Sequence, residues 1–159
     1  MITGHPKKAF PINGVDGAAI LRGSIGSAVL ASCPAATAMA IDEFLIIFIL
    51  AAKAKGISYF KNLAELDQKE SPRLQWGAKI LNLMGVKNIV TKNSIKIFGN
   101  PDFEIRKKIV IKDYLKDHRV FMTCVVAGLS FGGEWHIHDK DSIKTSFPSF
   151  LKIINQLKT

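Results

Sequence analysis

The strongest constraint on the fold is an internal repeat, which indicates that one structural unit occurs twice in this chain. In each copy an Asp precedes an apolar run of helical length, and a Lys follows that Asp 27 positions later: Asp42 and Lys69 in the first copy, Asp117 and Lys144 in the second. Each copy reads as a helix, a strand, a loop that carries the Lys, and a second helix. The sequence therefore predicts an α/β fold built by duplication of one unit.

The first copy begins with a predicted helix that has a capping signal before it and a terminating residue after it. Asp42 is a candidate N-cap, the run 44–52 (FLIIFILAA) is apolar, and Gly56 follows as a helix terminator. Downstream, the pattern predicts three further elements: a strand at 57–60, a helix that starts with Ser71 as N-cap and Pro72 and stops at Gly85, and a hairpin of strands 86–90 and 94–98.

The second copy repeats this order. Asp117 precedes the apolar run HRVFMTCVVAGLS, which ends near Gly132 and Gly133. Around this helix the pattern predicts a strand at 103–111, a strand at 134–138, and a final helix after Ser146.

The remaining residues set the domain organisation. We expect an irregular N-terminal segment over 1–17 and one folded unit over 18–159, with the two repeats at about 41–99 and 116–158. Inside this unit we also expect a short strand at 18–22 and a strand and loop over 26–40.

The charge points to an anionic partner without identifying it. The net charge of +9 suits nucleic acid, a membrane surface or a phosphorylated small molecule. The lysines are scattered, so a solvated surface remains the alternative. We do not expect nucleic acid as the main partner because no aromatic-basic motif of an RNA-binding type is present. We expect no membrane partner either, because the longest apolar run, 44–52, is too short to span a bilayer.

The other informative residues point to packing rather than to metal or redox chemistry. Cys33 and Cys124 lie far apart and outside any CxxC motif, so we expect reduced core thiols. His136 and His138 alternate on one strand face without further ligands at metal spacing, so no metal is expected. Trp76 and Trp135 are expected in the core. With no apolar leader visible at the N-terminus, we expect a soluble, cytoplasmic protein.

Cations gather at the predicted helix starts, where they oppose the helix dipole. Lys69 and Arg73 stand at one start, and His118, Arg119 and Lys144 stand near two others. A helix N-terminus carries unsatisfied N–H groups and partial positive charge, so added cations favour a bound phosphate or carboxylate. The alternative is that Glu70 and Asp117 offset the cations as local ion pairs. Asp42 likewise has an alternative role as a simple helix cap.

Four motifs in a fixed order resemble one enzyme family. They are AIDEFLIIFILAAKAKG at 40–56, LAELDQKESPRLQWGAKILNLMGV at 63–86, KDHRVFMTCVVAGL at 116–129 and SIKTSFPSF at 142–150. The pattern is similar to the C-terminal part of EPSP synthases (3-phosphoshikimate 1-carboxyvinyltransferases), which act in the shikimate pathway of aromatic amino acid biosynthesis. The likeness covers about residues 18–157.

The resemblance implies a fold and a reaction. The family fold has two similar domains, each of three βαβαββ units, with helix N-termini directed into the cleft between them. This chain would hold roughly two of the repeats of one domain, an α/β (α+β) arrangement. The family reaction transfers an enolpyruvyl group from phosphoenolpyruvate to the 5-hydroxyl of shikimate 3-phosphate and needs no cofactor.

The resemblance also implies roles for individual residues. Asp42 would contact the shikimate ring and act as base on the hydroxyl, Lys69 would contact substrate and assist proton transfer, and Glu70 would exchange the proton with the methylene carbon. The carboxylate and phosphate of phosphoenolpyruvate would be bound by Arg73, Arg119 and Lys144, and His118 would support this wall of the cleft.

Three positions and one missing region depart from the family pattern. Pro72 replaces an Asp, Asp67 replaces an Arg, and Leu45 stands near a usual Pro. The Lys-Ser-x-x-x-Arg element and the opposite domain are not found, so a separate chain is expected to complete the cleft if the protein is active. The alternatives are a non-catalytic remnant or an anion- or nucleic-acid-binding interaction domain. A sister enzyme acting on a UDP-sugar fits less well because of the KES-PR and DHR motifs.

Overall fold

The computed structural model describes residues 2–3 and 41–156. The strands predicted at 18–22 and 26–40, Cys33 and most of the predicted irregular segment 1–17 lie outside the described residues.

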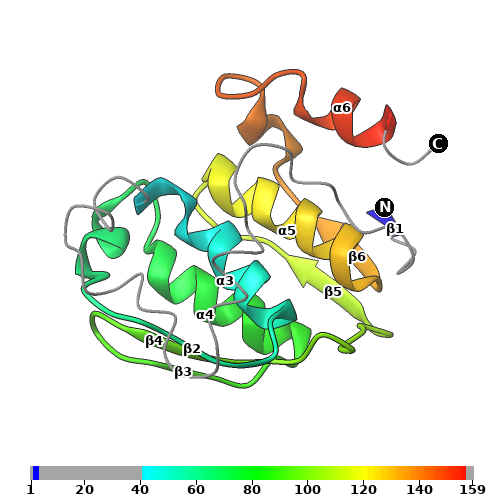
Figure 1. Ribbon diagram of the computed structural model, residues 1–159. Helices are drawn as coiled ribbons and strands as arrows, with labels where there is room; N and C mark the ends of the chain where they lie inside the picture. The colour runs from blue at the N-terminus through cyan, green and yellow to red at the C-terminus, as the bar shows by residue number, and fades with distance from the viewer. Residues whose placement is uncertain (1, 4–40, 157–159) are drawn as a thin grey trace.

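The residues of the predicted first repeat form a layer of two helices on a three-stranded antiparallel sheet (Figure 1). The strand order is β2-β4-β3, and the registers pair Ile57 with Phe98 and Val90 with Ile95. The elements are α3 (Phe44–Lys53), β2 (Gly56–Phe60), α4 (Arg73–Met84), β3 (Asn88–Val90) and β4 (Ile95–Gly99). The predicted hairpin is confirmed, with its strands joined by the residues TKN and Ser94.

A second, smaller sheet has the order β1-β6-β5, and of its strands only β6 lies within the predicted second repeat. Helix α5 (His118–Phe131) connects two parallel strands, and β1 pairs antiparallel with β6. The strands are β1 (Ile2–Thr3), β5 (Lys108–Ile111) and β6 (Glu134–Ile137). A 3-10 helix, η4 (Lys140–Ile143), then leads to α6 (Phe150–Gln156), which lies beyond α5 in Figure 1.

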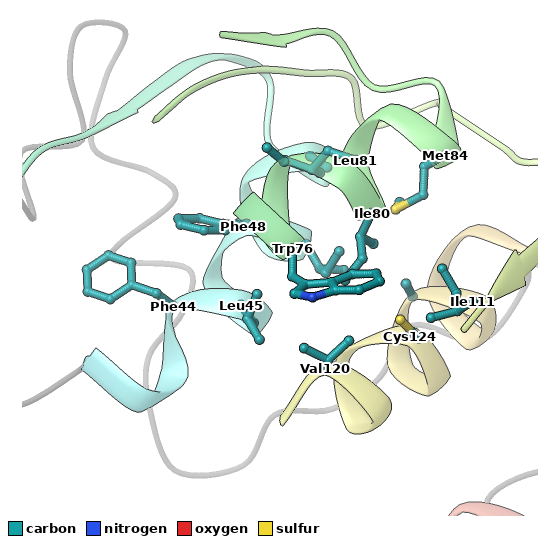
Figure 2. Packing of buried hydrophobic residues seen from close by; sticks show 14 of the residues in the cluster. Phe44, Leu45, Phe48, Trp76, Ile80, Leu81, Met84, Ile111, Val120 and Cys124 are labelled. Atoms are coloured by element: carbon teal, nitrogen blue, oxygen red, sulfur yellow. The ribbon is translucent and has the colours of Figure 1, made fainter. Parts of the chain in front are cut away.

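The core lies where α3, α4 and α5 meet. Trp76 is surrounded there by apolar side chains from all three helices, among them Leu45, Ile80 and Val120 (Figure 2). Trp76 and Trp135 are both buried, which confirms the packing prediction for the two indoles. Cys124 is a free, fully buried thiol, and burial raises its pKa above the ordinary cysteine value.

Two predicted elements differ from the structure, for local reasons. The strand expected at 103–111 is regular only in β5, because before it the N–H of Ile105 bonds to the carbonyl of Phe131 instead of joining a ladder. The last helix starts at Phe150 rather than just after Ser146. Pro148 disfavours helical backbone at the residue before it, and the turn after η4 continues through that point. Among the described helices, none has the length and apolarity needed to cross a bilayer.

Candidate functional site: a charged cluster at three helix starts

Asp42 and Arg73 meet because α3 and α4 bring their N-terminal ends together. Asp42 lies in η2 (Ile41–Glu43), the 3-10 turn that precedes α3. Its Oδ1 accepts a 2.7 Å hydrogen bond from Arg73 Nη1 and lies 3.6 Å from Lys69 Nζ. The alternative role of Asp42 as a cap is not observed, because the N-cap position is Glu43 and carries no side-chain cap bond.

Arg73 is the centre of this cluster and is only 2% exposed. Besides Asp42, it contacts Glu70 through Nη2, and its Nε donates to Asp117 Oδ2 at 2.9 Å. A guanidinium so deeply placed requires carboxylate partners, since an unpaired buried charge is very unfavourable. These contacts link the starts of α3, α4 and α5.

Asp117 is the fully buried partner in this cluster. Its side chain is 0% exposed. Ser71 Oγ donates to its Oδ2 at 2.7 Å, and the backbone N–H of Arg119 donates to its Oδ1 at 2.9 Å. Asp117 is therefore the N-cap of α5, the helix that the sequence predicts directly after it. The prediction that Ser71 caps α4 is wrong, because its hydroxyl serves Asp117 instead.

The partners of Asp117 also control its ionisation. Burial alone would raise the pKa of this carboxyl, but the hydrogen bonds from Arg73 and Ser71 and the charge of Arg73 outweigh burial and hold the pKa below its ordinary value. A depressed pKa in the folded state stabilises the protein above the unfolded-state pKa, and this contribution is lost as the pH falls.

We therefore expect the free energy of unfolding to decrease as the pH is lowered from about 4, the ordinary pKa of Asp. Chemical denaturation at several pH values, on wild type and on Asp117→Asn, measures this contribution. The difference between the two proteins should shrink toward low pH. A difference that stays constant from neutral pH down to strongly acidic pH would contradict the assignment.

Lys69 and Arg119 extend the cluster toward solvent. Lys69 Nζ lies 3.8 Å from Glu65 Oε1 in addition to its contact with Asp42. Arg119 Nη1 bonds to Glu43 Oε1 in a partly exposed ion pair. Beside this pair is a pocket of about 170 Å³, which is lined by Asp42, Glu43, Arg119 and Thr123 and by apolar side chains of α3, α5 and α6.

The two other predicted site residues lie apart from these contacts. Lys144 is 69% exposed and pairs with Asp141 at 2.8 Å, so the structure does not bring it to the cluster. His118 is half-buried at the first position of α5, next to Arg119. Four of the predicted residues thus meet directly (Asp42, Lys69, Glu70 and Arg73), and Arg119 shares the pocket with Asp42.

The charge balance of the cluster differs from a purely cationic trap. Three cations (Lys69, Arg73 and Arg119) are paired with five carboxylates: Asp42, Glu43, Glu65, Glu70 and Asp117. The alternative interpretation, local ion pairs at the helix starts, describes these contacts. Because the net charge of the whole chain is +9, the cluster is an acidic site on an otherwise basic protein.

Two members of this network were not predicted from the sequence. Glu43 directly follows Asp42, and the signal for a second acid was the IDE triplet itself. Glu65 precedes Lys69 by four positions, a spacing that brings opposite charges together on a helix. Both acids neutralise cations that the sequence-based prediction left free for a ligand.

Comparison with known proteins matches this chain to a family. The family model described as EPSP synthase (3-phosphoshikimate 1-carboxyvinyltransferase) matches residues 27–154. The 3-phosphoshikimate 1-carboxyvinyltransferase of Ruthia magnifica subsp. Calyptogena magnifica is 40% identical over 119 residues, covering 75% of this chain and 27% of that protein. The enzyme of the same name from Vesicomyosocius okutanii subsp. Calyptogena okutanii is also 40% identical over 119 residues, with the same coverage of both chains.

A solved structure agrees with these relatives. The EPSP synthase from Acinetobacter baumannii superposes with a TM-score of 0.72 at 35% identity, over 79% of this chain and 29% of that chain. The chain spans a little over a quarter of the length of the relatives it matches. The matching family model, the identities and the shared mixed fold of small sheets and helices lead to one conclusion: the chain belongs to the EPSP synthase family.

Proposed function

We propose that this chain carries the C-terminal wall of an enolpyruvyl transfer site for phosphoenolpyruvate and shikimate 3-phosphate. The observation that carries the proposal is the convergence of Asp42, Lys69, Glu70 and Arg73 through direct contacts, although Asp42 and Arg73 are 31 positions apart in sequence. Family membership supplies the reaction class, and the cluster supplies side chains suited to it.

The proposed roles follow the chemistry of the transfer. Asp42 would accept the proton of the attacking hydroxyl, and Glu70, exposed at the edge of the cluster, would exchange the proton at the methylene carbon. Lys69 and Arg119, both partly exposed, would bind the carboxylate and phosphate as the charge of the departing phosphate develops. Arg73 is so enclosed that an anion would reach only the Nη groups that Asp42 and Glu70 now occupy.

The acidic balance of the cluster bears on how the site would be completed. Two substrates that each carry a carboxylate and a phosphate would meet more carboxylates than cations on this wall, so tight binding requires further cations. We propose that another part of a complete enzyme, in the same chain or a separate one, supplies them across the cleft. The wall alone would then bind anions weakly and would not exclude water from the reaction.

A binding experiment on the chain tests the proposal. Millimolar phosphoenolpyruvate should raise the melting temperature, because a ligand that binds only the folded state stabilises it. Arg119→Ala should abolish the shift. Lys152→Ala, which removes an exposed charge from α6, is the matched control and should leave it unchanged. No shift in wild type, or equal shifts in wild type and Arg119→Ala, would contradict the proposal.

Glu43→Gln should act in the opposite direction. It removes the negative charge paired with Arg119 and so frees that cation for the ligand. One charge about 4 Å from a bound anion is worth about 1 kcal/mol in water, so we expect roughly fivefold tighter binding of phosphoenolpyruvate. Isothermal titration of the two proteins measures the ratio. Unchanged or weaker binding would show that the ion pair does not compete with the ligand.

The alternative function, a non-catalytic anion-binding or interaction domain, is favoured by one observation. The cluster is already neutralised by its own carboxylates. This alternative predicts that anions bind through scattered surface lysines, so Lys152→Ala and Arg119→Ala would weaken binding equally.

A further inference from the structure

The start of α4 lacks a cap of its own. Pro72 occupies the N-cap position, and its side chain has no hydrogen-bonding atom. The first N–H groups of a helix have no partner within the helix, and a cap side chain normally accepts from the second or third of them. Ser71, the neighbouring candidate, is engaged by Asp117. Another group must therefore accept from the first turn of α4.

Asp67 is that group, although it lies outside the helix. Its Oδ1 accepts from the N–H of Leu74 at 2.8 Å and from the N–H of Gln75 at 3.3 Å. Its Oδ2 accepts from Gln75 Nε2 at 3.2 Å. Both carboxylate oxygens thus bind the first turn of α4, and the negative charge sits at the favourable end of the helix dipole.

These bonds join the two ends of the short segment that bears Lys69 and Glu70. Asp67 belongs to η3 (Ala64–Gln68), and the residues between η3 and α4 are Lys69, Glu70, Ser71 and Pro72. Holding Asp67 against Leu74 anchors both ends of this short segment. Lys69 and Glu70 leave from its middle, and Arg73 stands beside the bonded Leu74 N–H.

We infer that Asp67 is a positioning residue that sets the loop 69–72 and the start of α4, and through them the placement of Lys69, Glu70 and Arg73. It also gives one reason for two departures from the family pattern. The pattern has Asp where this chain has Pro72, and Arg where it has Asp67. An Asp at the N-cap position is a usual cap. In this chain the capping carboxylate stands in the preceding 3-10 helix instead.

The inference about the cap is independent of any ligand. Its meaning for catalysis rests on the proposed function, because only then are Lys69 and Glu70 reactive groups. The test therefore uses the chain without substrate, so a failure of phosphoenolpyruvate binding leaves its outcome unaffected.

The test is a four-protein cycle of wild type, Asp67→Ala, Pro72→Asp and the double variant. Amide hydrogen exchange by NMR reports on Leu74 and Gln75, and the Nε–H signal of Arg73 reports on the bond to Asp117. Asp67→Ala should speed exchange of both amides by roughly fivefold, the effect of losing one cap, and should weaken the Arg73 Nε–H signal. The double variant should recover most of the amide protection and most of the Arg73 Nε–H signal, because the carboxylate introduced by Pro72→Asp restores a cap at the N-cap position.

Three controls separate positioning from a general loss of stability. Asp102→Ala removes an exposed carboxylate elsewhere and should change neither readout. Gln75→Ala removes only the Nε2 bond and should leave the Leu74 amide protected. Asp67→Asn keeps the accepting oxygen and should behave nearly as wild type.

Two outcomes would overturn the inference. One is unchanged exchange at Leu74 and Gln75 in Asp67→Ala. The other is a double variant no better than Asp67→Ala. If Asp67→Ala fails to fold, a folded double variant supports the relocated cap, and an unfolded one refutes it.

Discussion

Asp117→Ala should destabilise the chain by about 3–5 kcal/mol, the usual effect of removing one partner from a buried ion pair. The carboxylate is 0% exposed, and the guanidinium it binds is 2% exposed. Without Asp117, the Nε of Arg73 and the hydroxyl of Ser71 lose their acceptor in a place that water does not readily reach. The N-cap bond to Arg119 is lost as well. A chain of this size has about 5–15 kcal/mol of stability, so the variant would be marginally folded.

Chemical denaturation with a matched pair of variants measures this effect. Asp141→Ala also removes an aspartate from an ion pair, but its partner Lys144 is 69% exposed. A solvated pair of this kind contributes about 0–1 kcal/mol. A loss in Asp117→Ala as small as that in Asp141→Ala would show that Arg73 finds water or other partners and that the buried pair does not hold the helix starts together.

Phe48→Ala should destabilise the chain by about 3–5 kcal/mol, the usual range for removing a buried Phe. Phe48 is 0% exposed on α3, with ring centroids 5.9 Å from Phe44 and 5.5 Å from Phe60. Figure 2 shows it in the same apolar cluster as Trp76 and Leu81 of α4. The truncation leaves a cavity between α3 and α4, the two helices whose N-terminal ends bring Asp42 and Arg73 within 2.7 Å of each other.

A second substitution tests whether Phe48 packs as closely against Gly77 as the structure shows. A Cβ at Gly77 would stand 2.6 Å from Phe48 Cδ2, so Gly77→Ala should destabilise by about 1–3 kcal/mol through overpacking. In the Phe48→Ala background the same methyl enters the cavity. The double variant should therefore lose less stability than the two single variants together, as denaturation of all four proteins would show. Simple additivity would mean that Gly77 and Phe48 do not contact each other.

The helices and strands were largely predictable from local sequence because their signals are local. Alternating apolar residues, Gly85 in left-handed backbone at φ 97°, and Asp117 as N-cap depend only on neighbouring residues. The start of α4 was misassigned because two polar residues compete for one role there. Ser71 stands closer to the helix start in sequence, but its hydroxyl donates to the buried Asp117, and Asp67 accepts from the first turn of α4 instead. Such a choice depends on contacts 46 positions apart.

Prediction of the candidate site is limited in the same way, by contacts between residues that are distant in sequence. Motif order alone indicated Asp42, Lys69, Glu70 and Arg73, and the structure places these four in contact. The sequence did not indicate that Arg73 is enclosed by carboxylates, because burial follows from the packing of α3, α4 and α5 together. Lys144 was expected in the same wall, yet it pairs with Asp141 after η4. The predicted repeat assigns the two lysines equivalent positions in their own units, which does not make those positions neighbours in space.

The most direct measurement of the central claim is enolpyruvyl transfer by a chimera. Residues 41–156 of this chain would replace the matching segment of the Acinetobacter baumannii EPSP synthase, whose remaining residues would complete the proposed cleft. Phosphate release from phosphoenolpyruvate with shikimate 3-phosphate is then compared with that of the parent enzyme. The proposal predicts measurable transfer by the chimera and a loss of at least about 100-fold, typical for an acid–base residue, in the same chimera with Glu70→Gln. A folded chimera that releases no phosphate, or one indifferent to Glu70→Gln, would contradict the assignment of this cluster to enolpyruvyl transfer.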